Sequence, residues 1–232
     1  MRRAALLAVA AGALPAPAAA APPVIEQMVV KRNGDAQVQT LRARAATVRV
    51  GRRRCSVAAG TALAALTRSR VRRVSLRDFG SCSRRARDAG GLYVRAIGRD
   101  RARGRSGWVY KVGNRLATTG AGEVSGPFGR GRIRGRARVL WFHCRLDREG
   151  GCQSTLALRV RAVDGGVSAR VLAYDDEGEA APAAGAAVRS GAASAVADER
   201  GLATLALPAG RHRVHAELRG AIRSFPEGVA VR

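Results

Sequence analysis

Four cysteines behind an N-terminus typical of an export signal constrain the folding of this 232-residue chain more than any other feature. The N-terminus has a basic start at Met1-Arg2-Arg3, an apolar run over residues 4–14 and small residues up to Ala21. This order predicts a signal peptide over residues 1–21, cleaved near Ala21. A twin-arginine signal is disfavoured because the polar and bulky residues expected around the arginine pair are missing. The apolar run is shorter than the roughly 20 residues of a spanning helix, and no later segment is apolar enough to cross a bilayer.

An even number of cysteines in an exported chain predicts two disulfides. Of the three pairings that are open, we favour Cys55–Cys82 and Cys144–Cys152. The second pair brackets a turn-rich segment that could bring two strands together. The first would tie the start of an expected helix to a loop after the next strand. A zinc site of four thiols is the alternative, disfavoured because the chain has no C-x-x-C motif and thiols oxidise easily outside the cell.

The charge of the chain is strongly basic, with a net value of +25 and only two lysines, Lys31 and Lys111, among 42 basic residues. Such dominance of arginine is typical of a GC-rich genome and needs no nucleic-acid partner. A charge of this size would still attract an anionic envelope polymer. We therefore expect no nucleic-acid binding, and no transmembrane segment after the signal peptide.

Residues 22–157 are expected to form one α+β domain, a small mixed sheet with one short helix. The helix is predicted over 61–69, with Thr61 as N-cap and Leu63 and Leu66 on one face. Residues 139–144 are apolar on both faces, which is typical of a central strand. Alternation places Trp108 and Tyr110 on one face of another strand and Lys111 on the opposite face. The remaining strands are expected within residues 22–45, 47–50, 71–76, 91–97 and 108–112.

Residues 158–232 contain no cysteine and no tryptophan, and short strands alternate there with turn residues. This pattern predicts an all-β sandwich. The segments 185–188 and 197–210 resemble the carboxypeptidase regulatory-like and bacterial Ig-like modules, which generally act as spacers or adhesion units. The resemblance implies an Ig-like sandwich as a second domain. Strands are expected at 158–163, 167–174, 185–188, 194–197, 202–207, 212–218 and 228–231.

Three segments of the first domain resemble the transcobalamin C-terminal-like family: Thr47 to Leu66, Gly107 to Asn114 and Val139 to Phe142. The chain departs from that family at Val112-Gly-Asn-Arg and at Gly135-Arg-Ala-Arg138, so the resemblance does not extend to the hairpin geometry there. In animal transcobalamins this domain closes over a corrinoid held against a helical barrel, and no barrel is encoded here. A corrinoid-like ligand and a second chain that completes its site are thus implied by the resemblance alone; we expect no cofactor otherwise.

Scarce aromatic residues are the first candidate binding residues, because each is either a core anchor or a ligand contact. Trp108, Tyr110, Phe128 and Trp141 could form an aromatic face for a flat or apolar ligand. The simpler interpretation, which we favour, is that they fill the core of a small sheet.

Arginines that alternate along the sequence are candidate anion-binding residues. On an extended segment they would project from one side about 6.6 Å apart and could follow a polyanion. The alternative is a solvated face of arginine-biased loops, which we favour. The two series are Arg99, Arg101, Arg103 and Arg105, then Arg130, Arg132, Arg134, Arg136 and Arg138.

No catalytic or metal-binding constellation is found in the sequence. His143, His212 and His215 form no metal-ligand pattern, and the carboxylates at 175–177 and 198–199 occupy expected turns. We therefore expect a secreted or cell-surface protein that is not an enzyme and that captures a small ligand or partner through its first domain. The alternative is a structural cell-envelope protein that docks on anionic surface polymers by charge.

Overall fold

The computed structural model describes residues 21–80 and 82–232, and this part of the chain is mostly β. The predicted signal peptide lies outside the described residues except for Ala21. The elements, in chain order, are β1 (Val24–Val30), β2 (Ala36–Arg42), β3 (Ala46–Val50), β4 (Arg53–Val57), α1 (Ala62–Arg68), β5 (Val74–Asp78), η1 (Ala86–Gly91), β6 (Leu92–Ile97), β7 (Asp100–Arg101), β8 (Ser106–Val112), β9 (Arg115–Leu116), β10 (Arg138–Arg145), β11 (Thr155–Val163), β12 (Gly166–Tyr174), β13 (Ala180–Pro182), β14 (Ala187–Ser190), β15 (Ala193–Val196), β16 (Leu202–Ala206), β17 (Gly210–Glu217) and β18 (Glu227–Val231).

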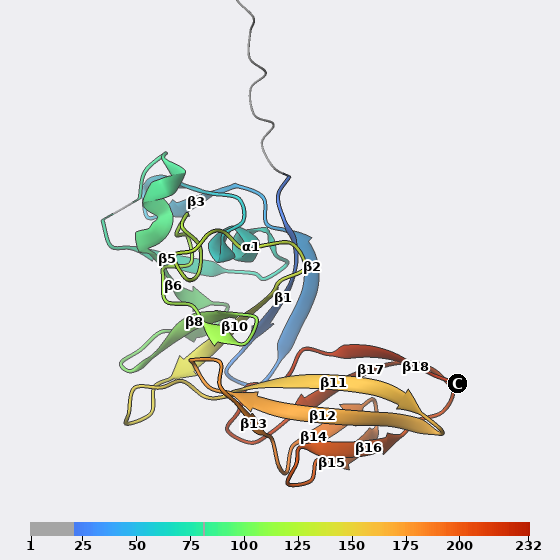
Figure 1. Ribbon diagram of the computed structural model, residues 1–232. Coiled ribbons are helices and arrows are strands. Elements are labelled where there is room, and N and C mark those ends of the chain that lie inside the picture. The colour runs from blue at the N-terminus through green and yellow to red at the C-terminus, as the bar shows by residue number, and fades with distance from the viewer. Residues whose placement is uncertain (1–20, 81) are drawn as a thin grey trace, which may run out of the picture.

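A five-stranded sheet of order β2-β1-β10-β8-β9 forms the centre of the N-terminal part of the chain (Figure 1). β10 lies in its middle, as its two-sided apolar sequence predicts, and Val139 and Phe142 on opposite faces are both fully buried. β10 pairs in parallel with β1 and antiparallel with β8. The sheet is therefore mixed.

The segment expected to hold one strand at residues 22–45 forms the hairpin β1–β2 instead. The turn includes Gly34 at φ +88°, a conformation that glycine adopts without steric cost. Lys31 N–H donates to the carbonyl of Asp35 at 2.9 Å and closes the hairpin. Sequence alternation alone could not reveal this turn, because charged residues are spread through the whole segment.

One face of the five-stranded sheet packs against α1, the hairpin β3–β4 and the three-stranded sheet β5-β6-β7. The helix matches the range predicted for it, and the hydroxyl of Thr61 accepts from Ala64 N–H at 3.2 Å as an N-cap should. Leu63 and Leu66 are fully buried in the resulting core. Trp108, Tyr110 and Trp141 enter the same core from β8 and β10.

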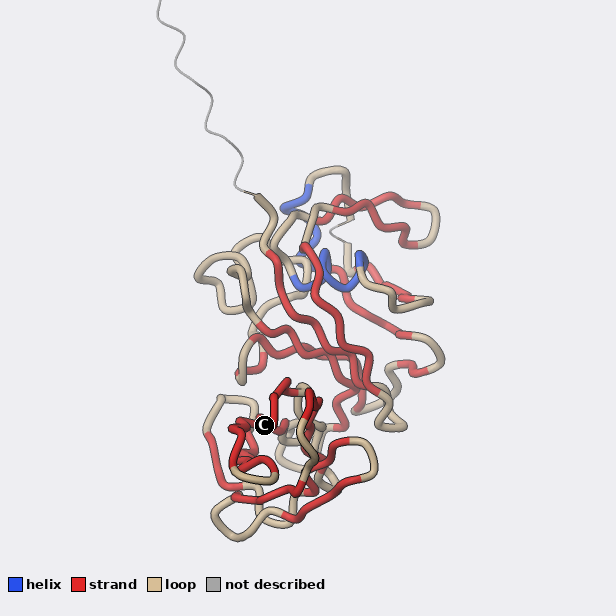
Figure 2. Tube along the Cα trace, turned by 90° about the vertical axis from the view of Figure 1, so that its right-hand side faces the viewer, coloured by secondary structure: helices blue, strands red, loops and turns tan. Residues whose placement is uncertain are grey.

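The opposite face of the five-stranded sheet packs against the C-terminal part of the chain, and Figure 2 shows the two parts from the side. Met28 and Phe142 are fully buried in this second cluster, and Phe225 reaches it from the segment before β18. Because both faces of the sheet are covered, its central strands have no solvent-facing side.

Two four-stranded sheets make up the C-terminal part, one with β11-β12-β13 and β16, the other of order β15-β14-β17-β18. A cluster of buried aliphatic residues that includes Val167, Val171 and Val214 belongs to both sheets. β11 begins at Thr155, so the domain boundary expected after residue 157 falls inside a strand. β13 was not expected from the sequence.

The two disulfides form with the predicted pairing. Cys55–Cys82 joins β4 to the segment after β5, and Cys144–Cys152 joins the end of β10 to the segment before β11. The Cα atoms of the pairs are 5.1 and 5.2 Å apart. Among the residues that the structure describes, no helix is long and apolar enough to cross a membrane.

Candidate ligand-binding site

Three of the four predicted aromatic residues lie side by side on one face of β8 and β10. Trp141 is directly opposite Tyr110 in the strand register, and their ring centroids are 5.1 Å apart. Trp108, one pair further along, is opposite His143 and meets its ring edge-on at 5.6 Å. The exposed fractions of Trp108, Tyr110 and Trp141 are only 3%, 6% and 1%, so these three rings belong to the core of the N-terminal part.

These three rings also line an apolar cleft of about 290 Å³. Residues of β6, β8 and the loop that follows β9 surround it. The lining carries no carboxylate, imidazole, thiol or ammonium group. We call it the aromatic cleft, and its lining consists of Phe79, Gly90, Gly91, Leu92, Tyr93, Val94, Trp108, Val109, Tyr110, Leu116, Ala117, Thr119, Gly120, Ala121 and Trp141.

Most polar atoms of these aromatic side chains are held by the backbone. The Trp108 indole N–H donates to the carbonyl of Asp100 at 2.8 Å, and the Tyr110 hydroxyl donates to the carbonyl of Thr119 at 3.3 Å. The indole N–H of Trp141 is buried and has no hydrogen-bond partner among the described residues. The rings are thus fixed in place, and one donor remains beneath the cleft.

The tyrosines of the cleft are uncharged at neutral pH. Burial raises the pKa of Tyr110 to about 12, opposed by its bond to Thr119. Burial also raises the pKa of Tyr93, opposed by the hydrogen bond from the Trp108 backbone. The walls of the aromatic cleft therefore carry no charge that would disfavour an apolar molecule.

Phe79 stands at the rim of the cleft with 65% of its surface exposed. Its ring meets Tyr93 edge-on, with centroids 6.3 Å apart, and the Arg77 guanidinium lies 4.9 Å from its centroid. An exposed phenylalanine beside an apolar cleft enlarges the surface open to a ligand. Phe79 and Tyr93 are not among the candidate residues predicted from the sequence, although the pattern at 91–97 does place Tyr93 on a strand.

Two close backbone contacts hold the loop that forms one wall of the cleft. A Cβ atom at Gly120 would lie 1.9 Å from the carbonyl oxygen of Gly90, and one at Gly122 would lie 2.3 Å from that of Ala89. The carbonyl of Ala121 accepts from Leu63 N–H at 2.8 Å, at the start of α1. Glycine is required here because no side chain fits between the loop and η1.

Phe128, the fourth predicted aromatic residue, does not line the cleft. It is partly buried in a loop, and the guanidinium of Arg115 lies 5.2 Å from its ring centroid. The structure therefore separates Phe128 from the other three rings.

Neither arginine series lies on one extended strand. Of the first series, only Arg101 lies in a strand, and positive-φ glycines at 98 and 104 turn the chain on either side. The side chains of both series are exposed except Arg138, which is partly buried in β10 and paired with Glu26 and Glu227. The two arginine series therefore do not form the evenly spaced rows of guanidinium groups that an extended segment would give.

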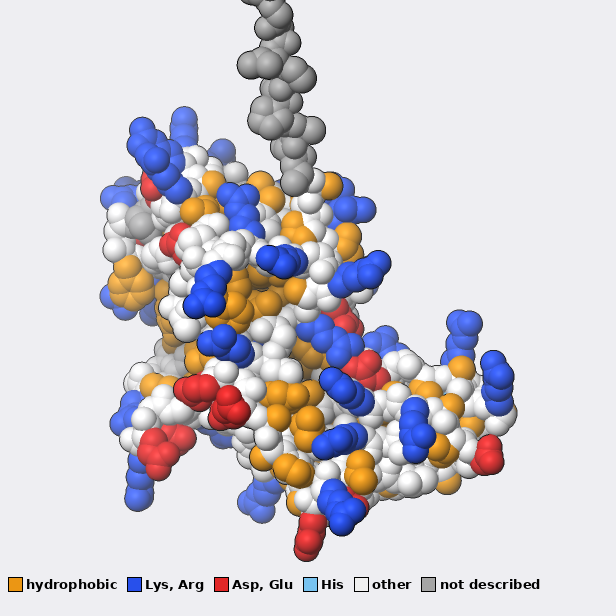
Figure 3. All heavy atoms as spheres, viewed as in Figure 1, with side chains coloured by type: hydrophobic (Ala, Val, Ile, Leu, Met, Phe, Trp, Pro, Cys, Tyr) orange, Lys and Arg blue, Asp and Glu red, His pale blue; other side chains and the backbone are white. Residues whose placement is uncertain are grey.

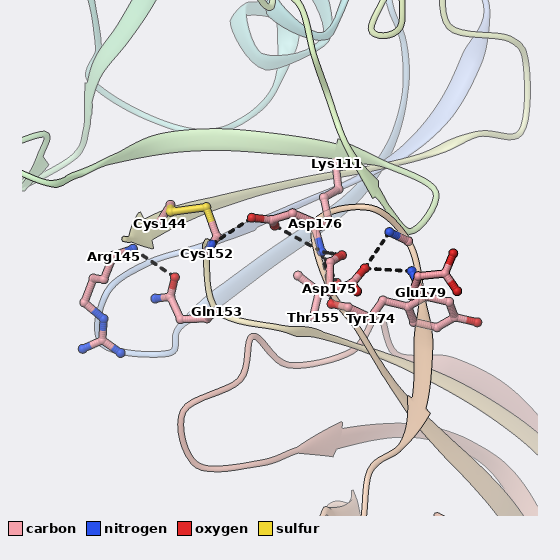
Figure 4. A network of polar contacts seen from close by, with 11 residues as sticks. Lys111, Cys144, Arg145, Cys152, Gln153, Thr155, Tyr174, Asp175, Asp176 and Glu179 are labelled. Atoms are coloured by element: carbon pink, nitrogen blue, oxygen red, sulfur yellow. Dashed lines mark hydrogen bonds and ion pairs between the residues drawn. A yellow bond between two sulfur atoms is a disulfide. The ribbon is translucent and has the colours of Figure 1, made fainter. Parts of the chain in front are cut away.

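A buried ammonium group joins the two parts of the chain away from the aromatic cleft (Figure 4). Lys111 is fully buried and donates to the Thr155 hydroxyl at 3.2 Å and to the carbonyls of Tyr174 at 3.2 Å and Asp175 at 2.5 Å. Asp176 Oδ1 lies 3.7 Å from its Nζ, and Asp176 Oδ2 accepts from Cys152 N–H at 2.8 Å. The carboxylate of Asp176 is thus more than a solvated turn cap, whereas that of Asp175 caps its turn by accepting from Gly178 and Glu179 N–H. The contacts account for every donor of Lys111.

Each of the three histidines contacts a different group. His143 Nε2 is 3.1 Å from the carbonyl of Arg101, His212 Nε2 is 2.8 Å from that of Pro208, and His215 is paired with Glu217. Within residues 21–80 and 82–232, no group of three or more His, Cys, Asp or Glu side chains could hold a metal ion. Comparison of the chain with protein-family models, with curated proteins and with solved structures gives no match.

Proposed function

We propose that this chain is an exported, non-catalytic binding protein whose aromatic cleft captures a small, flat, apolar molecule. The observation that carries the proposal is the uncharged cleft of about 290 Å³ with the strongly exposed ring of Phe79 at its rim. A concave apolar surface with few polar groups is the usual form of a small-molecule site. The two disulfides fit a protein that works outside the cytosol.

The cleft can supply only moderate affinity by itself. A two-ring aromatic body that loses roughly 200 Å² of apolar surface gains about 5 kcal/mol. Because association also costs translational and side-chain entropy, the Kd is at best on the order of 0.1 mM. Tighter capture needs either further polar contacts or a second surface that covers the ligand.

The likeness to the transcobalamin C-terminal-like domain agrees with such a second surface. In animal transcobalamins this domain closes over a ligand that another part of the protein holds. We extend that arrangement to this chain as part of the proposal: a second chain would cover the aromatic cleft, and a corrinoid-like ligand is one flat molecule of suitable kind. The Ig-like C-terminal module would then act as a spacer.

The test uses N-phenyl-1-naphthylamine, an uncharged probe whose fluorescence rises in apolar surroundings. Both tryptophans of the sequence line the cleft, so energy transfer from Trp108 and Trp141 reports binding there. We expect saturable transfer in the wild type. Ala117→Phe, which fills the cleft, should abolish transfer, and Phe79→Ala should weaken binding several-fold.

Val196→Ala is the matched control for Phe79→Ala, because Val196 is 69% exposed but lies in β15, away from the cleft. It should bind the probe as the wild type does. Equal binding by the wild type and by a folded Ala117→Phe variant would refute the proposed site.

Docking on an anionic envelope polymer is the second candidate function. Exposed lysine and arginine side chains are scattered over both parts of the chain in Figure 3. Binding by charge alone should disappear as salt screens it, whereas capture in the apolar cleft should persist. Retention on purified anionic wall polymer at low and high salt, measured with wild type and Ala117→Phe, separates the two functions.

A further inference from the structure

A basic groove of about 770 Å³ adjoins the aromatic cleft, and the two hollows share Phe79 and Tyr93. It lies between the β3–β4 turn and the strands β5 and β6. Four arginines and one carboxylate lie in its lining, which comprises Val50, Gly51, Arg52, Arg53, Leu76, Arg77, Asp78, Phe79, Gly80, Tyr93, Arg95 and Ala102.

The charges of this groove are only partly balanced. Asp78 lies 3.7 Å from Arg53 and also accepts from the N–H groups of Gly80 and Cys82. Arg77 lies against the Phe79 ring. Arg52 and Arg95 are exposed and form no ion pair within the described part of the chain. The groove therefore keeps an excess of positive charge.

The pairing of β5 with β6 places arginines of the basic groove next to the aromatic cleft. Tyr93 pairs with Arg77 across β5 and β6, and Arg95, which lies opposite the irregularity in this pairing, lines the groove together with them. A ligand body next to Tyr93 could thus extend an attached group to Arg77 and Arg95 without leaving the surface.

We propose that the ligand of this protein is a free small amphipathic anion, with its flat apolar body in the aromatic cleft and a carboxylate, sulfonate or phosphate group in the basic groove. This inference rests on the proposed function, since it assigns the body to the same cleft. Guanidinium groups bind such oxyanions with paired hydrogen bonds. Because these arginines are exposed, the gain is moderate, about tenfold in affinity at low salt.

Two fluorescent probes test this assignment, because they share one apolar body. 8-Anilinonaphthalene-1-sulfonate carries a sulfonate that N-phenyl-1-naphthylamine lacks. We expect the wild type to bind the sulfonate about tenfold more tightly, with the ratio falling towards one as salt rises. Arg52→Gln/Arg95→Gln, which leaves Arg77 in place against Phe79, should remove most of the sulfonate's advantage over the neutral probe and leave binding of the neutral probe unchanged.

The matched control is Arg161→Gln/Arg211→Gln, which removes the same net charge from exposed positions in β11 and β17. It should leave both affinities unchanged. An equal loss in both double variants would assign the effect to overall charge and overturn the inference. So would a sulfonate affinity no higher than that of the neutral probe, while the proposed function would stand.

Failure of the proposed function and binding to a lipid surface would each give a different result from those above. If the neutral probe does not reach the cleft at all, the proposed function itself fails, and the inference fails with it. Co-sedimentation of the chain with phosphatidylglycerol vesicles that is lost in Arg52→Gln/Arg95→Gln but kept in the control would assign the groove to a lipid surface. That result would overturn the assignment to a free small molecule.

Discussion

Lys111 Nζ lies 3.7 Å from Asp176 Oδ1, and this pair ties β8 of the five-stranded sheet to the turn after β12. An ammonium group has three donors, and the Thr155 hydroxyl and the carbonyls of Tyr174 and Asp175 accept them. A planar guanidinium could not place its donors in the same way. This geometry gives a physical reason for one of only two lysines in a chain that otherwise uses arginine.

Replacing Lys111 should therefore lower the stability of the fold. Lys111→Met keeps the side-chain length but leaves two backbone carbonyls and Asp176 without their buried partner. Breaking a buried pair from one side costs about 3–5 kcal/mol. We expect a loss of that size in the free energy of unfolding, measured by urea titration followed by tryptophan fluorescence.

Lys31→Met is the control for that experiment. The Lys31 side chain is 49% exposed, and its Nζ lies 4.0 Å from an exposed Asp35. Exposed pairs contribute little, so the change should stay within about 0.5 kcal/mol. Similar losses in the two variants would contradict the role given to Lys111.

The two disulfides should differ in their contribution to stability. Cys55–Cys82 spans 27 residues and Cys144–Cys152 spans 8. Loop-closure entropy gives about 3.6 kcal/mol for the longer loop and about 2.5 kcal/mol for the shorter one. Paired Cys→Ala variants, unfolded in urea, should show this order. A larger loss of stability on removal of Cys144–Cys152 would contradict this order. It would mean that the hydrogen bond from Cys152 N–H to Asp176 contributes more than the difference in loop-closure entropy.

Local sequence patterns predicted the elements that depend on near neighbours. Thr61 as N-cap, the apolar strand at 139–144 and the nearest-neighbour pairing of the cysteines are all present. Each of these three predictions depends only on residues that are close together in the sequence. The parallel pairing of β1 with β10 could not be found in this way, because it joins residues more than 100 positions apart, such as Glu26 and Arg138.

The candidate site was predicted only in part, for the same physical reason. Alternation placed Trp108 and Tyr110 on one face, but the cleft also needs Phe79 and the loop at 116–121. Lys111 was correctly placed on the opposite face of its strand. A lysine there would ordinarily face solvent; only the packing of the C-terminal sheets against this face buries it.

His215 should make stability depend on pH in the acidic range. Burial lowers its pKa below 6.5, and Arg223 and Arg189 add to this effect while Glu217 opposes it. Between the lowered pKa and 6.5 the unfolded chain binds more protons, so stability falls as pH falls through this window. His215→Gln should remove that part of the loss, measured as unfolding midpoints from pH 7.5 to pH 5.

His212→Gln serves as the control, because His212 lies on the same strand and its ring contacts a backbone carbonyl, that of Pro208. Its profile against pH should follow that of the wild type. If His215→Gln shows the wild-type slope instead, the protonation of His215 does not contribute to acid sensitivity.

Gly120→Ala should deform the aromatic cleft from its backbone side. The added methyl group would lie 1.9 Å from the carbonyl oxygen of Gly90, so the loop at 116–121 must move away from η1. Overpacking of this kind costs about 1–3 kcal/mol. Gly228→Ala is the matched control, because a Cβ there has no atom within 4 Å. We expect Gly120→Ala to lose both stability and binding of N-phenyl-1-naphthylamine, whereas Gly228→Ala should retain both. Full probe binding by Gly120→Ala, despite lower stability, would show that this loop supports the fold without shaping the ligand site.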